Sequence, residues 1–148
     1  MTNKAIFAAG CFWGIEDKFA TAKGVVGTEV GYIGGKSKNP TYEEICRGDT
    51  FHAEAVRVFY DTEIITYDQL LDLFFEIHDP TTLNSQGPDF GTQYRSEIFY
   101  FNESQKKIAE KVLTRINEKL SGKVVTKISL IKNYCAAEEY HQKYLEKK

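Results

Sequence analysis

The residues best suited to chemistry in this sequence surround Cys11, within a Gly-Cys-Phe-Trp-Gly stretch at residues 10–14. The stretch follows an apolar run at residues 5–9 that is typical of a buried strand. It precedes residues 15–20, whose apolar side chains recur at helical spacing. Free N–H groups at a helix N-terminus and the helix dipole favour a thiolate, the reactive form of cysteine. The sequence therefore predicts a reactive thiolate, and a buried core cysteine is the plainer alternative.

Four further side chains are candidates to supply or hold a proton near such a thiol. They are Tyr42, Glu54, Asp89 and Tyr94. Each also has an ordinary structural explanation: a helix surface for Tyr42, a solvent-facing strand start for Glu54, turn chemistry for Asp89 and core packing for Tyr94. Spacing along the chain does not show that they converge on Cys11.

The three histidines offer a rival chemistry. His52 or His78 could serve as the base for Cys11 in a cysteine hydrolase, which would need no reductant. His141 lies in a charged C-terminal stretch and is expected to be solvated. A second rival is a binding module without catalysis, in which Cys11 would react no faster than a model thiol. No HExxH or paired ligand spacing occurs, so we expect no metal site.

Composition narrows the class of protein. A chain of 148 residues predicts one domain spanning residues 1–148. The net charge of −2 requires no basic face, so we do not expect nucleic acid as a partner. The three cysteines, Cys11, Cys46 and Cys135, are an odd number at wide spacings, which fits neither a disulfide framework nor a zinc site. With no visible signal peptide or membrane span, we expect a cytoplasmic protein with reduced cysteines.

The elements that must position these residues follow from periodicity. Strands are predicted at residues 25–33, 53–60, 96–101 and 124–131, and helices at 41–46, 66–77, 103–120 and 138–148. The polar segment at residues 78–93 is too long for an ordinary connection and is interpreted as a functional loop. Residues 132–137 are expected to be irregular. The β-α-β, β-α-β order predicts an α+β fold, a ferredoxin-like split βαβ sandwich with a C-terminal helix and strand extension.

Seven blocks of sequence resemble the A-type methionine sulfoxide reductases and occur in the family's order across nearly the whole chain. They are GCFWG at residues 10–14, GYIGG at 31–35, PTYEE at 40–44, HAEAV at 52–56, HDPT at 78–81, GTQYRS at 91–96 and AEEYHQ at 137–142. The resemblance implies reduction of methionine S-sulfoxide, free or within proteins, to methionine. It implies repair of oxidised proteins without a bound cofactor.

The resemblance also implies roles for individual residues. Cys11 matches the nucleophile, which becomes a sulfenic acid. Phe12 and Trp13 match aromatic walls around the substrate's S-methyl group, and Glu54 matches the acid that protonates the sulfoxide oxygen. The remaining matches are Tyr42 and Tyr94, as hydroxyls that bind that oxygen, and Asp89, as a supporting polar residue.

The chain departs from the family at its C-terminus, where many members carry a resolving cysteine in a Gly-rich tail. The sequence ends at Lys148 without that tail, so we expect a short form. Cys135, and less readily Cys46, is a candidate resolving cysteine. The leading alternative is a one-cysteine cycle, in which thioredoxin, glutaredoxin or glutathione attacks the sulfenic acid. Some family members use selenocysteine as nucleophile, and the letters do not show whether Cys11 stands for one. A monomer is expected.

Two aromatic residues also depart from the family's pattern. Phe51 replaces a usual glycine and Phe90 a common histidine. Both changes concern the rim of the expected pocket.

Overall fold

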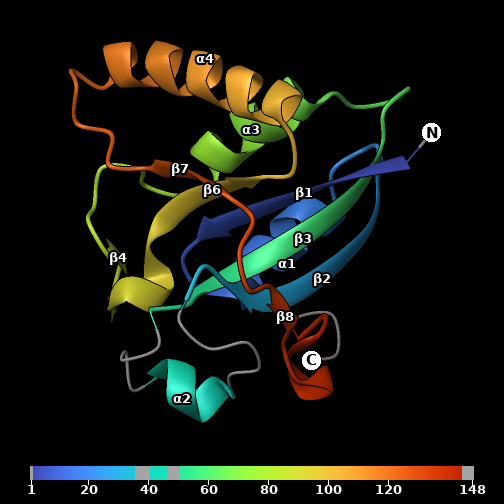
Figure 1. The fold of residues 1–148 in the computed structure, drawn as a ribbon, viewed down its shortest axis with the longest axis vertical. Helices are drawn as coiled ribbons and strands as arrows, with labels where there is room; N and C mark the ends of the chain where they lie inside the picture. The colour runs from blue at the N-terminus through green and yellow to red at the C-terminus, as the bar shows by residue number, and fades with distance from the viewer. Residues whose placement is uncertain (1, 36–40, 47–50, 145–148) are drawn as a thin grey trace.

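The computed structural model describes residues 2–35, 41–46 and 51–144, apart from the side chains of residues 45 and 46. A six-stranded sheet in the order β7-β6-β1-β3-β2-β8 forms its centre (Figure 1). The strands are β1 (Thr2–Ala9), β2 (Val25–Ile33), β3 (Ala53–Asp61), β6 (Ser96–Tyr100), β7 (Lys127–Leu130) and β8 (Cys135–Ala136). Neighbouring strands are antiparallel except for β6 and β7, which are parallel.

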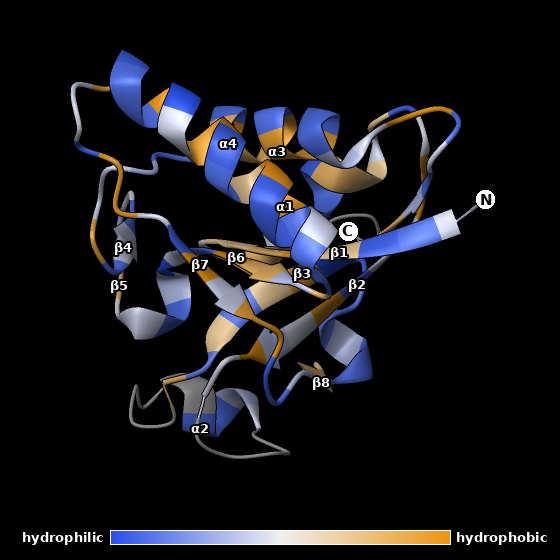
Figure 2. Ribbon diagram, turned by 45° about the horizontal axis from the view of Figure 1, so that its top comes forward, coloured by the Kyte–Doolittle hydropathy of each residue, from blue (hydrophilic) through white to orange (hydrophobic). Residues whose placement is uncertain are grey.

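The main helices cover one face of this sheet. They are α1 (Phe12–Ala20), α3 (Tyr67–Glu76) and α4 (Glu103–Lys119), and Figure 2 shows them on the same side. A shorter helix, α2 (Tyr42–Cys46), lies between β2 and β3 in the chain, and 3-10 turns occur at η1 (Thr92–Tyr94) and η2 (Glu139–His141). The predicted α+β class is therefore confirmed.

The four central strands run in the order β6-β1-β3-β2, with helix α1 between β1 and β2 in the chain and α3 between β3 and β6. β1 is thereby flanked by strands on both sides, and its apolar run at residues 5–9 is buried on both faces. The end of the strand that leads to Cys11 is thus enclosed on both faces of the sheet.

The core on the helix face is largely aromatic. The Phe7 ring stacks on Phe19 of α1 at 5.2 Å between centroids and on Phe74 of α3 at 5.3 Å. Leu70 and Leu71 of α3 are fully buried in the same cluster. These contacts fix α1 against β1, and so fix the residue between them.

The helix starts confirm the capping signals in the sequence. Thr66 accepts a hydrogen bond from the Gln69 N–H, and the Gln69 side chain accepts one from the Thr66 N–H. Thr41 and Glu44 make the same reciprocal pair at the start of α2. Each pair satisfies two N–H groups that a helix N-terminus leaves open.

Residues 78–93, which we interpreted as a functional loop, are a largely irregular segment that contains a small hairpin of β4 (Ser85–Gln86) and β5 (Asp89–Phe90) and leads into η1. Two other predictions for the rest of the chain are wrong. Residues 132–137 are not all irregular, because β8 pairs with the edge of β2. The described part of the predicted helix at 138–148 is only the turn η2, and residues 145–148 lie outside the described chain.

Contacts with distant strands explain the missing C-terminal helix. The Gln142 side chain accepts from the Val30 N–H and donates to the Val30 carbonyl, both at 2.9 Å. These hydrogen bonds with the sheet edge outweigh the helix propensity of the C-terminal segment. Among the described residues, no helix combines the length and the apolar character that crossing a bilayer requires.

Candidate active site

Cys11 lies between the end of β1 and the start of α1, as the sequence predicts. It is the N-cap residue of α1, and it is half-buried. Gly10, which precedes it, has φ of 108°, and a Cβ there would meet the Gln86 side chain at 2.9 Å. A glycine is therefore required to turn the chain into the helix while the β4–β5 hairpin packs against it.

The surroundings of Cys11 act on its pKa in opposite directions. Burial is the largest effect and raises the pKa above its ordinary value. The N–H groups of Trp13 and Gly14 lower it, whereas the negative charges of Glu54 and Asp89 raise it. The balance is a raised pKa, so the net shift opposes the thiolate that the sequence favoured. The helix terminus acts as predicted, but desolvation and two nearby carboxylates outweigh it.

Glu54 lies beside Cys11 at the start of β3 and is only 1 % exposed. Its Oε1 accepts a hydrogen bond of 3.2 Å from the Phe12 N–H. Its Oε2 is buried and has no hydrogen-bond partner in the part of the chain that the structure describes. Burial, opposed by the Phe12 bond and assisted by Asp89, raises the pKa of Glu54 to about 8. Near neutral pH this carboxyl is mostly protonated and can donate its proton.

An aromatic cluster borders the thiol. Phe12 is buried and lies 5.7 Å from the Tyr32 ring and 6.5 Å from the Tyr42 ring. Trp13 is partly exposed, and Tyr144 stacks on it at 4.0 Å with 15° between the planes. The predicted aromatic surface beside the sulfur is present, and the C-terminal segment adds to it.

The expectation that His141 is solvated is wrong. This residue is 1 % exposed, and its Nδ1 accepts a hydrogen bond of 3.0 Å from Trp13 Nε1. Burial lowers the pKa of His141, although Glu138 opposes this effect. A neutral ring suits the contact, because Nδ1 must be unprotonated to accept from the indole.

Glu138 joins the C-terminal segment to two walls of the site. One carboxylate oxygen accepts from the Tyr32 hydroxyl at 2.8 Å, and the other accepts from the Tyr42 N–H at 3.0 Å. Reasoning from single residues missed Tyr32, Glu138, His141 and Tyr144 as parts of the site. The block at residues 137–142 was the available signal, but neither its burial nor its partners could be read from spacing.

Asp89 and Tyr94 reach the site from the segment after α3. Asp89 is in β5, and its charge acts on both Cys11 and Glu54. Tyr94 ends η1, which packs against β3, the strand that carries Glu54. The structure thus brings Asp89 to the predicted group directly and places Tyr94 on an adjoining turn.

The histidines proposed for a hydrolase have other partners. His52 is buried, and its Nδ1 accepts a hydrogen bond of 3.2 Å from the Gly35 N–H. Both ring nitrogens of His78 are engaged, with the Phe74 carbonyl and the Ser96 hydroxyl. His78 is therefore unavailable as a base for Cys11, and the hydrolase reading loses its support.

The two other cysteines differ in what the structure says of them. Cys135 is half-buried in β8, opposite Tyr32 of β2. Strands β3 and β2 separate β8 from β1, so at a strand spacing of about 4.8 Å the two strands are about 14 Å apart. A disulfide needs Cα atoms within about 7 Å, so Cys135 does not reach Cys11 in this conformation. The Cys46 side chain lies outside the described residues.

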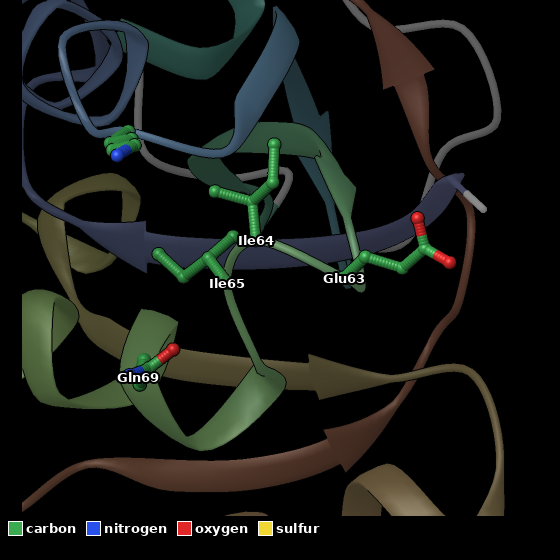
Figure 3. A pocket seen from close by; sticks show the side chains of 5 residues that line it. Glu63, Ile64, Ile65 and Gln69 are labelled. Carbon is green, nitrogen blue, oxygen red and sulfur yellow. The ribbon is translucent and has the colours of Figure 1, made fainter.

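A separate pocket of about 560 Å³ opens far from Cys11, at the turns that follow α1 and β3 (Figure 3). Its lining includes Lys23, Glu63, Ile64, Ile65 and Gln69. These side chains offer one ammonium, one carboxylate and one amide, but no nucleophile. Among the described residues, no three histidine, cysteine or acidic side chains gather as metal ligands do.

Comparisons with known proteins agree with this geometry. The family model of peptide methionine sulfoxide reductase matches residues 3–148. A peptide methionine sulfoxide reductase MsrA of Pelagibacter ubique is 64 % identical over 144 residues, which covers 97 % of this chain and 98 % of the relative.

Solved structures give the same result. The reduced form of Mxr1 from Saccharomyces cerevisiae superimposes with a TM-score of 0.95 at 42 % identity, covering 99 % of this chain and 86 % of that one. Mxr1 in complex with Trx2 matches with a TM-score of 0.70 at 28 % identity, over 97 % and 84 % of the two chains. The protein therefore belongs to the A-type peptide methionine sulfoxide reductases, thiol-dependent oxidoreductases that repair methionine sulfoxide through a cysteine sulfenic acid.

Proposed function

We propose that Cys11 is the nucleophile of this reductase and that Glu54 is its general acid. The observation that carries the proposal is the Glu54 carboxyl group. One oxygen is held by the Phe12 N–H, the other is buried without a partner among the described residues, and the pKa is raised to about 8. A protonated acid with a free oxygen is suited to donate to a sulfoxide oxygen, which is a poor leaving group until it is protonated.

The aromatic side chains would hold the substrate for this transfer. We assign Phe12 and Trp13 to the apolar surface that receives the S-methyl group. Tyr42 and Tyr94 would hydrogen-bond the sulfoxide oxygen, and Asp89 would support the protonated state of Glu54 through its charge. This arrangement would select the S-sulfoxide, free or within a polypeptide, because the methyl group, the oxygen and the sulfur of the substrate must each contact a different surface of the site.

The proton inventory of the step is balanced. Cys11 gives up its thiol proton and attacks the substrate sulfur, while Glu54 protonates the sulfoxide oxygen. A bond forms between the sulfurs of Cys11 and the substrate as the substrate's sulfur–oxygen bond breaks and the protonated oxygen leaves as hydroxide. Hydroxide then attacks the Cys11 sulfur and breaks the sulfur–sulfur bond, so that methionine leaves and Cys11 becomes a sulfenic acid. Cys11 is thereby oxidised by two electrons, and its former proton restores Glu54. Since the protonated Glu54 removes one of the charges that raise the pKa of Cys11, it also favours ionisation of the thiol.

We further propose that an external thiol reduces the sulfenic acid. Cys135 lies two strands beyond the Glu54 strand, with the buried Tyr32 between them, so an internal disulfide would need β8 to leave the sheet. Mxr1 has been solved in complex with Trx2, which favours a thioredoxin-type protein as the reductant here. Glutaredoxin and glutathione supply the same chemistry: the first thiol displaces water from the sulfenic acid, and a second thiol then releases Cys11.

Substitution of Glu54 tests the proposal. Glu54→Gln keeps the shape and the contact with the Phe12 N–H but has no acidic proton. We expect it to bind sulfoxide with near wild-type affinity, followed through the fluorescence of Trp13, the chain's only tryptophan. We expect its single-turnover rate to fall roughly 10²- to 10⁴-fold. Near wild-type turnover by Glu54→Gln at neutral pH would remove Glu54 from the acid role.

A monomeric state and a cytoplasmic location stay predictions from the sequence. Sedimentation of the purified chain at micromolar concentration tests the first of them.

A further inference from the structure

A chain of hydrogen bonds joins the two ends of the segment that carries Asp89 and Tyr94. His78 begins that segment, and Ser96 ends it. His78 Nε2 lies 2.7 Å from Ser96 Oγ, which lies 2.7 Å from Thr126 Oγ1. We call these three residues the His78 clasp.

We propose that the His78 clasp is a positioning device for the reductase reaction. It holds Asp89 and Tyr94 at fixed positions relative to Cys11. The inference rests on the roles proposed above for these residues. The clasp residues are positioning residues, since they act through the segment rather than on the substrate.

The clasp has only one consistent arrangement of protons. The Phe74 carbonyl lies 2.6 Å from His78 Nδ1 and can only accept, so Nδ1 carries the proton. In the neutral ring, Nε2 then accepts from the Ser96 hydroxyl, and Ser96 accepts from Thr126. Burial lowers the pKa of His78 to about 4, opposed by the Phe74 bond and the charge of Asp79, so the ring stays neutral near pH 7.

Burial makes the clasp costly to open. Ser96 is 4 % exposed, and Thr126 is also buried. A Ser96 or Thr126 hydroxyl that loses its partner there has little water to replace it. The His78 ring also packs on Phe74 of α3 at 4.4 Å between centroids. The clasp therefore ties the end of α3 to the start of β6.

One clasp residue, Ser96, pairs with the end of the strand that leads to the nucleophile. Ser96 pairs with Ala9 across β6 and β1, and Cys11 follows Ala9 by two residues. Inside the segment, the Gln86 side chain approaches Gly10 so closely that a Cβ there would lie 2.9 Å away. Both the C-terminal end and the middle of the segment thus pack against the chain around the turn that holds Cys11.

Bonds within the segment make it move as a unit. The Gln86 side chain bonds both the N–H and the carbonyl of Asp79, which follows His78. The Gly91 N–H donates to the Asn84 carbonyl at 2.9 Å. Because the segment is held together internally, release of its Ser96 end shifts Asp89 and Tyr94 together rather than loosening one residue.

Such a shift has an electrostatic consequence that simple destabilisation lacks. The titratable groups that act on or face Glu54 are Cys11 at the N-cap of α1, Tyr32 from β2 and Asp89 from β5. Asp89 raises the pKa of Glu54. When the segment moves away, the pKa of Glu54 falls, and the alkaline limit of activity moves to lower pH.

Ser96→Ala tests the clasp, because it leaves His78 Nε2 and the Thr126 hydroxyl without their partner. We expect kcat/KM for methionine sulfoxide to fall about tenfold, as small misplacements of reacting groups do, with its alkaline limit at lower pH. Ser129→Ala is the matched control, since it removes a hydroxyl that bonds Glu97 on the neighbouring strand. This control should keep the wild-type kcat/KM and pH profile.

A second pair of variants covers the case in which Ser96→Ala does not fold. Thr126→Val removes the outer hydroxyl with its shape conserved, and Thr126→Ser restores it. We expect Thr126→Val to shift the alkaline limit in the same direction and Thr126→Ser to return it to the wild-type value.

Two outcomes would overturn the inference. One is wild-type kcat/KM in Ser96→Ala or Thr126→Val. The other is a lower rate with an unmoved alkaline limit, which would mean that the clasp only stabilises the fold. The proposed function fails separately: wild-type kinetics in both Asp89→Asn and Tyr94→Phe would remove those roles, whatever the clasp variants do.

Discussion

Two buried glutamates lie at helix α1, Glu16 within it and Glu54 bonded to its first N–H group, and their surroundings are opposite in kind. Glu16 accepts from the Thr28 hydroxyl at 2.8 Å with one oxygen and from the Lys143 N–H at 2.7 Å with the other. Glu54 has a single described partner, the Phe12 N–H, and its second oxygen is buried without one. The Glu16 contacts fasten the C-terminal segment to the helix. The Glu54 surroundings leave hydrogen-bonding capacity unused, which is costly unless a substrate takes it up.

The comparison suggests how to tell a structural carboxyl group from the one that we propose as the general acid. Burial does not separate them, since both side chains are almost fully enclosed. The hydrogen bonding of their oxygens does separate them, because a carboxyl group that only stabilises the fold has its hydrogen-bond partners in place. An active site instead keeps a group whose partner arrives with the substrate.

The largest effect should appear in the pH dependence of turnover. The pKa of Glu54 is raised from 4.5 to about 8, so the acid form that donates a proton prevails below about 8. We expect kcat/KM to fall about tenfold per pH unit above that value, as the carboxylate replaces the acid. Glu54→Gln should lose this dependence, and Glu16→Gln should keep it. An unchanged alkaline limit in Glu54→Gln would contradict the assignment of the proton donor.

A second prediction concerns Trp13, which lies between the surroundings of Glu54 and the C-terminal segment that Glu16 fastens to α1. It faces the site, and it is held by His141 and Tyr144 of the C-terminal segment. Trp13→Ala removes apolar surface from the proposed methyl pocket. Since full burial of a large apolar side chain is worth about 1.5–3 kcal/mol, KM should rise roughly 10- to 100-fold. The KM of Trp13→Phe, which keeps an aromatic ring, should lie between the values of the wild type and Trp13→Ala. An unchanged KM in Trp13→Ala would take this residue out of the pocket wall.

A third prediction uses stability to sharpen the contrast between the glutamates. Glu16→Gln replaces an acceptor oxygen by a donor amide at a buried site, and its free energy of unfolding should fall by about 1–3 kcal/mol. Substitution of Glu54 should have the opposite effect on stability. Its folded-state pKa lies above its unfolded value, so its ionisation favours the unfolded chain as pH rises from 4.5 through 8. Glu54→Gln should therefore unfold at higher urea than the wild type at pH 8.

The control for that prediction is a measurement at pH 5. There Glu54 is largely protonated in the folded state, so most of the advantage of Glu54→Gln should disappear. A loss of stability in Glu54→Gln at pH 8 would show that its carboxyl group is a structural one, like that of Glu16.

The smallest effect should come from Cys135→Ala. Because β8 lies three strands from β1, we expect this variant to keep the wild-type kcat with thioredoxin or glutathione as reductant. A collapse of multiple turnover, with the first turnover preserved, would identify Cys135 as a resolving cysteine after all.

The sequence was most informative where chemistry depends on local structure. A cysteine between an apolar strand and an amphipathic helix must lie near the helix N-terminus, and Cys11 does. The reciprocal caps at Thr41 and Thr66 are equally local, since donor and acceptor lie three residues apart. Glu54 could be nominated from a motif, but its burial could not, because it depends on packing by α1 and the hairpin.

What escaped prediction depends on long-range contacts. His141 is buried because Trp13, far away in the sequence, donates to its ring. The residues expected to form a C-terminal helix are instead paired with Val30 at the sheet edge. The direction of the Cys11 pKa shift was also missed, because desolvation and the charges of Glu54 and Asp89 are properties of the assembled site.

The most direct test of this account is the mass of the intact protein after one turnover. The fully reduced protein is mixed with excess methionine sulfoxide in the absence of any reductant, and released methionine is counted per chain. The account predicts one methionine per chain and a gain of one oxygen, located on Cys11 and absent from Cys11→Ser. A loss of two hydrogens would contradict the one-cysteine cycle, and an unchanged mass without methionine would contradict the role of Cys11 itself.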